Sequence, residues 1–88
     1  MVERSVTIRN TLGLHARPAA LFVQAAARFA SRITVSNNDE EVDGKSIMGV
    51  LMLAAGKGSI VTIRAEGEDS EDAVNTLVAL VETGFDEE

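Results

Sequence analysis

The chain has 88 residues, which suffices for one domain, over residues 1–88, with one hydrophobic core. Apolar residues make up 45% of it and charged residues 25%, as is typical of a folded globular domain and not of a disordered one. The net charge is −6 and there is no cysteine, so disulfides and thiol chemistry are excluded.

The composition also argues against membranes, export and nucleic acid. The apolar segment IMGVLMLAA (47–55) is less than half of the about 20 residues that a membrane span needs. The N-terminal MVERSV has no apolar core of the secretory type, so we expect a cytoplasmic protein. A negative net charge and the lack of Tyr and Trp disfavour nucleic-acid binding.

The charges are unevenly distributed along the chain. Five arginines and no acidic residue lie between Arg4 and Asn38, whereas the acidic residues concentrate in 39–43 and 66–88. The surroundings of His15 are therefore locally positive, which favours an anionic ligand or an acidic partner. The alternative is that such an asymmetry arises by chance in a small domain.

The first third of the chain predicts a strand, a loop and a helix. VERSVTIR (2–9) alternates apolar and polar residues, as a half-buried strand does. After the loop NTLGLHA, a helical spacing of apolar residues begins at Pro18, a residue type suited to a first turn. Because the residue before proline disfavours helical angles, Arg17 is expected outside the helix, which begins within two or three residues of His15.

The remaining segments predict an α+β domain of two layers. Strands are expected at 32–36, 40–43 and 60–66, and helices at 47–53 and within 66–84. Ser46 is the expected N-cap of the short helix, Gly84 ends the last one, and FDEE (85–88) is expected to be frayed. The order β-α-β-β-α-β-α predicts three helices covering one face of a sheet, with the last strand between the two strands of the first β-α-β unit.

The segment LGLHARPAA (12–20) holds the single histidine and the single proline of the chain. The free N–H groups and dipole of a helix N-terminus bind anions, so Ala16 and Arg17 would cradle a phosphate with their main chain. The guanidinium of Arg17 also suits phosphate oxygens. The positive helix end should disfavour imidazolium, leaving His15 neutral and nucleophilic. The cluster predicts a reversible phosphoryl carrier; the alternative is an ordinary loop histidine beside a solvated arginine.

Other chemistries lack the residues that they need. A lone imidazole has no co-ligands for a metal, and no second catalytic group supports a hydrolase with His15 as general base. DGKS (43–46) is not a nucleotide-binding loop, since that pattern requires glycine where Asp39 stands. We therefore expect no metal and no cofactor.

Three segments resemble the signatures of one family. GLHARPAA (13–20) resembles the phosphorylation-site motif of HPr, the histidine-containing phosphocarrier of the bacterial phosphoenolpyruvate-dependent phosphotransferase system. GKSIMGVLML (44–53) resembles the motif around the family's regulatory serine, and GSIVTIRAEGEDSEDAV (58–74) resembles its last strand and helix entry. The resemblance spans nearly the entire chain. It implies an open-faced sandwich with an antiparallel sheet in the order 1-4-2-3 and three helices on one face.

HPr proteins accept a phosphoryl group from enzyme I, which phosphoenolpyruvate charges, and pass it to enzyme IIA domains for sugar uptake. The resemblance implies that His15 takes this group on Nδ1 and that Arg17 stabilises it, in a monomeric carrier rather than an enzyme. It also implies phosphorylation of Ser46 by an HPr kinase/phosphorylase, with a catabolite-control transcription factor as a further partner.

A docking patch is predicted beside His15. The helix 47–53 is apolar nearly all round, yet only one side of it, with Val50 and Leu53, can face the core. The remaining apolar side, together with a stripe on the first helix, suits a surface that fits several partners. The predicted docking residues are Ala16, Ala20, Gln24, Ala27, Ile47, Met48 and Leu51. Many family members have lysine where this chain has Gln24 and Ala27.

Two other functions stay open at this point. One is a paralogue that works in a nitrogen-related branch of the phosphotransferase system, with the same chemistry and different partners. The other is a regulatory binding module that acts through Ser46 and passes no phosphate onward; the pairing of His15 with Arg17 argues against it.

Overall fold

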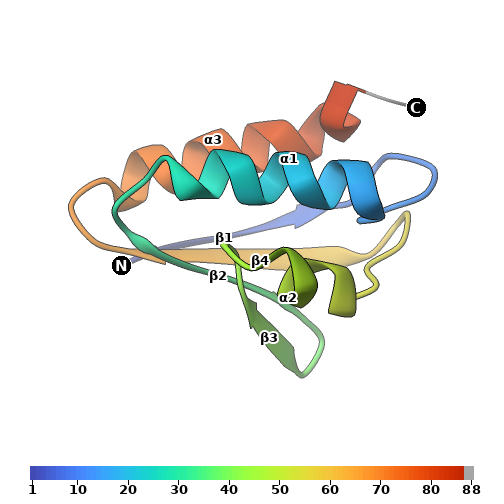
Figure 1. Cartoon of the computed structure of the whole chain (residues 1–88), viewed down its shortest axis with the longest axis horizontal. Helices are drawn as coiled ribbons and strands as arrows, with labels where there is room; N and C mark the ends of the chain where they lie inside the picture. The colour runs from blue at the N-terminus through green and yellow to red at the C-terminus, as the bar shows by residue number, and fades with distance from the viewer. Residues whose placement is uncertain (87–88) are drawn as a thin grey trace.

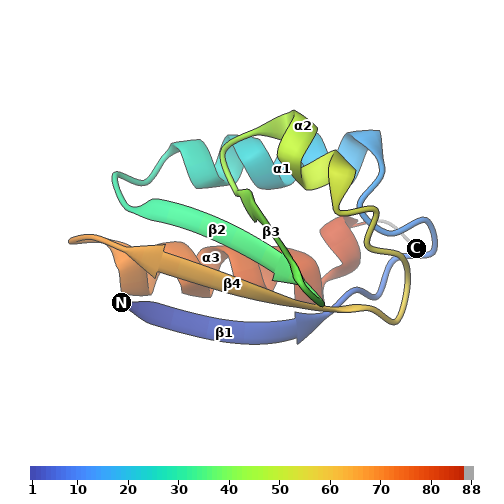
Figure 2. The same ribbon diagram turned by 90° about the horizontal axis from the view of Figure 1, so that it is seen from below.

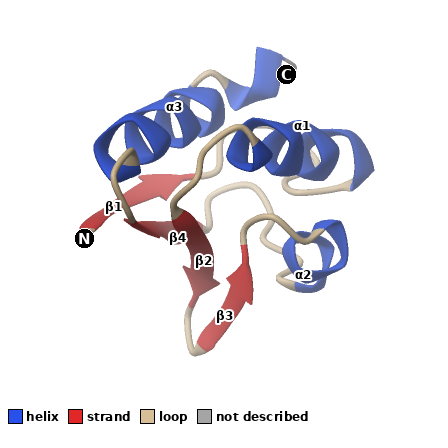
Figure 3. Ribbon diagram, turned by 60° about the vertical axis from the view of Figure 1, so that its left-hand side comes forward, coloured by secondary structure: helices blue, strands red, loops and turns tan. Residues whose placement is uncertain are grey.

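A computed structural model describes residues 1–86 as a sheet with helices packed on it. The elements in chain order are β1 (Val2–Thr7), α1 (Ala16–Ala27), β2 (Arg32–Asn37), β3 (Glu40–Asp43), α2 (Ile47–Met52), β4 (Ile60–Glu66), α3 (Ser70–Glu82) and a short 3-10 turn, η1 (Gly84–Asp86). Helices α1 and α3 lie side by side over one face of the sheet, and α2 packs against α1 and β3 (Figures 1 and 3).

The four strands pair in the order β1-β4-β2-β3, and every pairing is antiparallel. Figure 2 shows β4 between β1 and β2, which confirms the predicted insertion of the last strand. The register places Val6 opposite Val61 and Val35 opposite Ile63. The apolar residues of neighbouring strands therefore share one face, as the period-two alternation requires.

The core fills the space between this face and the two long helices. Its sheet side consists of Val6, Ile33, Val35, Val61, Ile63 and Ala65, and its helix side includes Ala19, Phe22, Ala26, Val74, Leu77 and Val81. All of these side chains are buried. The helical spacing of apolar residues read from the sequence thus points inward, and the α+β class and sheet order are confirmed.

The opposite face of the sheet is polar. Arg64 at its centre forms ion pairs with Glu3 on β1, at 3.0 Å, and with Glu41 on β3, at 3.7 Å. Ser5 and Thr62 share a hydrogen bond of 2.9 Å between their hydroxyl groups. Exposed pairs of this kind contribute at most about 1 kcal/mol each, so this face is held mainly by main-chain pairing.

Helix α2 begins as predicted. The Oγ of Ser46 accepts the main-chain N–H of Gly49 at 3.1 Å, which is the N-cap bond. Val50 and Leu53 are buried, as the sequence indicates. The helix ends at Met52, one residue earlier than predicted, and Ala54 then takes a left-handed conformation with φ of 51°.

The start of α1 differs from the prediction. The helix begins at Ala16, with His15 as its N-cap, so Arg17 lies inside the first turn and not before it. Pro18 is then the third helical residue, where its missing N–H would have no partner within the helix. The main-chain N–H of Ala19 donates to the carbonyl oxygen of His15 at 2.9 Å, and this bond together with the burial of Pro18 and Ala19 outweighs the restriction that proline places on Arg17.

Both ends of the chain also differ from the prediction. The regular part of β1 ends at Thr7, two residues early, although Ile8 still bonds through its main chain to Ser59 and Gly58. Phe85, expected to be frayed, is only 1% exposed, because left-handed conformations at Gly84 and Phe85 turn the chain back onto the core. Burying a phenylalanine is favourable by about 1.5–3 kcal/mol, which offsets the strained backbone. Residues 87 and 88 of the predicted tail lie outside the described residues.

The loop after α1 is held by side chains from two other loops. The carboxylate of Asp69 accepts the main-chain N–H groups of Ala30, at 2.8 Å, and Ser31, at 2.9 Å, as well as the Ser31 hydroxyl. From the other side, Lys45 Nζ donates to the carbonyl oxygen of Phe29 at 2.7 Å. The hydrogen bonds from Ser31 and Ala30 hold the pKa of Asp69 below its ordinary value of 3.8.

Because the pKa of Asp69 is lowered on folding, its carboxylate contributes stability above the ordinary pKa, and that contribution is lost as the pH falls through the folded-state value. We expect Asp69→Asn to reduce the free energy of unfolding at about pH 7 and to have a smaller effect at about pH 3. Urea denaturation of both proteins at the two pH values measures this. The control Asp39→Asn removes the same charge from the β2–β3 turn, and an Asp69 effect that is equal at both pH values would contradict the assignment.

Candidate functional site

The loop that carries His15 is pressed against the chain segment that follows α2. Gly13 has a φ of 67°, and a Cβ added to it would lie 2.3 Å from the carbonyl oxygen of Ala55 and 2.7 Å from the Cα of Gly56. Only glycine fits this contact and this conformation. The main-chain N–H of Leu14 donates to the same Ala55 carbonyl at 2.9 Å. The contact therefore brings the N-terminus of α1 to the C-terminal end of α2.

His15 is held through its main chain on both sides. Its N–H donates to the carbonyl oxygen of Gly13 at 2.9 Å, and its own carbonyl oxygen accepts the N–H of Ala19 at 2.9 Å. The residue has extended angles, with φ of −85° and ψ of −167°, as an N-cap requires. Its side chain is half-buried, so the imidazole is not enclosed in the core.

The N-terminus of α1 is electrostatically suited to an anion. The helix has 12 residues and no acidic residue in its first turn. Its aligned peptides place about half a positive charge at this end, where the main-chain N–H groups of the first turn point along the helix axis. Arg17 is exposed in the same turn and adds a full positive charge. An imidazole and a positively charged helix end thus occupy three consecutive residues, 15–17.

Ser46 lies apart from the N-terminus of α1. It caps the end of α2 remote from Ala55, and six helical residues at a rise of 1.5 Å separate the two ends by about 9 Å. Ser46 is half-buried, with its Oγ occupied by the bond from Gly49. The N-terminus of α1 and Ser46 are therefore separate features, and α2 lies between them.

The predicted docking residues lie on two helices that contact each other. Ala16, Gln24, Ala27, Ile47 and Met48 are exposed, whereas Ala20 is half-buried and Leu51 is half-buried against the core. Met48 is 65% exposed and Ile47 is 42% exposed.

The structure adds two exposed apolar side chains to the same region. Met52 is 70% exposed at the end of α2, and Leu12 is 69% exposed on the turn before His15. Leu12 was missed because a single leucine in a turn carries no periodic signal. Met52 belongs to the apolar segment 47–53, of which the core covers only one side.

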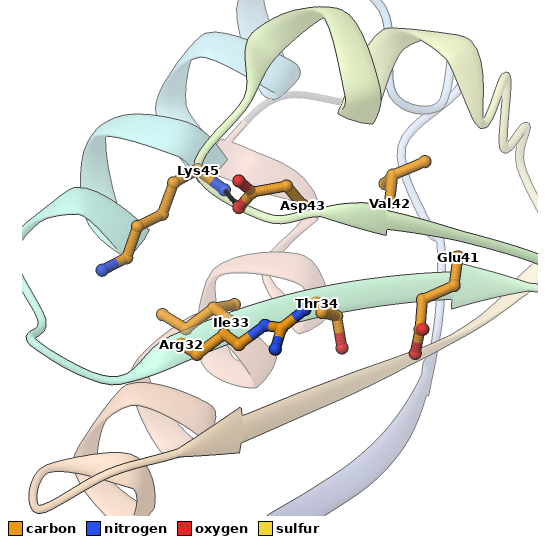
Figure 4. A pocket seen from close by; sticks show the side chains of 7 residues that line it. All are labelled: Arg32, Ile33, Thr34, Glu41, Val42, Asp43 and Lys45. Carbon is orange, nitrogen blue, oxygen red and sulfur yellow. Dashed lines mark hydrogen bonds between the residues drawn. The ribbon is translucent and has the colours of Figure 1, made fainter.

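A hollow that His15 does not line has the wrong chemistry for a reaction site. It has a volume of about 370 Å³ and lies between β2 and β3. Its lining residues are Arg32, Ile33, Thr34, Glu41, Val42, Asp43 and Lys45. Figure 4 shows these side chains spread along the two strands rather than converging on one point, and the main-chain N–H of Lys45 donates to Asp43 at 2.8 Å. Its two cationic and two anionic side chains balance, so the hollow attracts neither anions nor cations strongly.

The described part of the chain has neither a metal cluster nor a membrane-spanning helix. Among residues 1–86, no group of three or more His, Asp or Glu side chains could hold a metal ion. No helix in that range has the length and apolarity needed to cross a membrane.

Comparison with known proteins agrees with this arrangement. The family described as "PTS HPr component phosphorylation site" matches residues 2–83. The phosphocarrier protein HPr of Pseudomonas aeruginosa is 53% identical over 88 residues, covering 99% of this chain and 98% of that protein. The crystal structure of HPr-C-His from Thermoanaerobacter tengcongensis superposes with a TM-score of 0.96, at 49% identity, over 100% of this chain and 99% of the other.

A further similar structure is that of Crh, described as the Bacillus subtilis catabolite repression containing protein, in which a swapping domain forms a dimer. It is 45% identical, covers 96% of this chain and 97% of that one, and has a TM-score of 0.77. The proteins that this chain matches over nearly its whole length form a class of phosphoryl carriers. The chain belongs to the HPr family of phosphocarrier proteins.

Proposed function

We propose that this protein accepts a phosphoryl group on His15 Nδ1 from phosphorylated enzyme I and delivers it to enzyme IIA domains for sugar uptake. The observation that carries the proposal is the position of His15 as the half-buried N-cap of α1, next to Arg17. Membership of the family makes the relay the natural setting for that site. A nitrogen-related branch of the system would use the same chemistry with other partners.

The transfer is a displacement between two histidines. The lone pair of His15 Nδ1 forms a new N–P bond while the N–P bond to the imidazole of enzyme I breaks, and its electron pair returns to that ring. Transfer to an enzyme IIA histidine repeats the exchange in the other direction. Positioning and charge stabilisation then supply the rate, since neither step needs a metal or a further base.

An exposed helix end suits a carrier that must also release its cargo. The main-chain N–H groups of Ala16 and Arg17 and the Arg17 guanidinium stabilise the charge that arrives on the phosphoryl group. Because Ala16 and Arg17 are exposed, water screens this attraction and keeps the phosphohistidine from becoming too stable to react. The site thus favours transfer in both directions.

We expect His15→Ala to abolish acceptance of phosphate while leaving the fold intact, because His15 contributes its side chain to the surface and not to the core. Incubation with enzyme I and radiolabelled phosphoenolpyruvate, followed by a test for acid-labile phosphate, measures acceptance. The matched control is Asn75→Ala, an exposed substitution on α3 that should accept phosphate at the normal rate. Undiminished labelling of the His15 variant would overturn the site assignment.

Docking on the exposed apolar side chains of α1 and α2 is the second part of the proposal. Methionine is flexible and polarisable, so Met48 and Met52 suit a surface that meets both enzyme I and enzyme IIA domains. The patch borders the N-terminus of α1, and a partner seated on it would bring its own histidine toward His15. The small side chains of Ala16, Ala20 and Ala27 allow such a partner to approach α1 closely.

We expect Met48→Asp to raise the KM of enzyme I for this protein about tenfold, equivalent to about 1.4 kcal/mol, with little change in the maximal rate. Ile60→Asp is the matched control, because Ile60 is similarly exposed, at 60%, on the polar face of the sheet. Steady-state kinetics of phosphoryl transfer separates the two parameters. Equal effects of the two substitutions would contradict docking on α2.

Regulation through Ser46 is the third part, and the likeness to Crh favours it. A phosphate on Ser46 is tolerated at the N-terminus of α2, so it would act by adding negative charge beside Met48 rather than by unfolding the helix. An HPr kinase/phosphorylase would supply it from ATP, and a catabolite-control transcription factor would read it. Such a module could also act without passing phosphate onward. We take the carrier to be a cytoplasmic monomer.

We expect an HPr kinase and ATP to place one phosphate on Ser46, and the phosphorylated protein to accept phosphate from enzyme I at least tenfold more slowly, because the added charge repels the partner. Mass spectrometry locates the phosphate. Ser36→Ala, a control on β2, should be labelled normally, whereas Ser46→Ala should not. If the kinase adds no label to the wild type, Ser46 serves as an N-cap only.

A further inference from the structure

Asn10 is a buried polar side chain between the end of β1 and the loop that carries His15. It is 1% exposed, and its Nδ2 donates to the carbonyl oxygen of Gly13 at 2.7 Å. The same oxygen accepts the main-chain N–H of His15 at 2.9 Å. One carbonyl group therefore joins the Asn10 side chain to the main chain of His15.

The shared carbonyl matters because the bond from His15 to Gly13 is weak by itself. It spans only two residues, as in a γ-turn, and such a contact does not hold a loop in one conformation. The hydrogen bond from Asn10 is buried, where hydrogen bonds are stronger and their loss is costly. It fixes the direction of the Gly13 carbonyl and, through it, the N–H of His15.

The surroundings of Asn10 leave it little freedom to move. A Cβ added to Gly84 would lie 3.7 Å from the Cβ of Asn10, so the C-terminal turn packs directly on this residue. Phe85, buried in the core, anchors that turn. The main-chain N–H of Gly13 also donates to the carbonyl oxygen of Asn10, at 3.2 Å. Asn10 is thus fixed between the C-terminal turn and the loop.

We propose that Asn10 is a positioning residue for the phosphoryl acceptor. Its amide sets the main-chain orientation of His15 through the Gly13 carbonyl, and it touches neither the phosphoryl group nor a partner. Displacing a reacting atom by about 1 Å can slow a transfer up to a hundredfold, so a loop held in one conformation is worth a measurable part of the rate. This inference rests on the proposed carrier function of His15.

The test compares Asn10→Ala with Val74→Ala, which also removes buried atoms but lies in the N-terminal half of α3. The maximal rate of phosphoryl transfer from enzyme I should fall about tenfold or more for Asn10→Ala, with KM within about twofold of the wild type. Val74→Ala should leave both parameters within about twofold. A merely structural role for Asn10 would give the two folded variants equal kinetics, and that result would overturn the proposal.

Hydrogen exchange of the wild-type protein supplies a test that needs no variant. The His15 amide should exchange at least about a hundredfold more slowly than in an unstructured chain, and exchange near the unstructured rate would overturn the proposal. Asn10→Ser, with a shorter polar side chain, replaces Asn10→Ala if the latter does not fold. Absence of labelling of the wild type by enzyme I would refute the carrier function itself, whereas the exchange experiment judges the loop independently of it.

Discussion

The arrangement of the site depends on one main-chain contact, the approach of Gly13 to Ala55 and Gly56. The carbonyl oxygen of Ala55 accepts the N–H of Leu14, and there is no room for a side chain at Gly13. This contact joins the loop after β1 to the segment after α2, two parts of the chain about 40 residues apart. The N-terminus of α1, with His15, and the apolar side of α2 come to one side of the molecule because of it.

The rest of the structure keeps that contact in place from a distance. β4 leads from the segment after α2 into the middle of the sheet, and its pairing with β1 returns the chain to the loop before His15. At the other end of α1, Asp69 and Lys45 hold the following loop from two sides. The helix is therefore fixed at both ends, and its N-terminal N–H groups point to a defined position.

Much of this could be predicted from the sequence, because strict alternation and helical spacing both survive in the fold. β2, β3 and β4 lie where the pattern placed them, α1 and α3 do so apart from their ends, and Ser46 caps α2. Arg17 and Phe85 were placed wrongly for one reason. Local preference disfavours a helical residue before proline, but the burial of Pro18 and Ala19 outweighs it. Local preference also disfavours order in a short tail, but the burial of Phe85 outweighs that too. No local pattern in the sequence reveals this burial.

The features of the candidate site also differ in whether a local sequence pattern reveals them. A single histidine beside an arginine at a helix start is visible in the sequence, as is the apolar excess of α2. The role of Asn10 is not visible, since it depends on a buried hydrogen bond to a carbonyl that also accepts from His15. Leu12 escaped notice because only the shape of the loop exposes it.

The exposed apolar side chains gather around α2, whereas the far side of the sheet is polar apart from Ile60. This distribution affects how the partners of the proposed relay can bind. A domain of this size offers one binding surface, so the phosphoryl donor and the acceptor bind to it one at a time and cannot form a ternary complex. Each encounter has to end quickly for the next to begin. The overall rate of such a carrier is limited by the frequency of encounters with its partners. An excess of either partner inhibits transfer involving the other, because the two compete for the same surface.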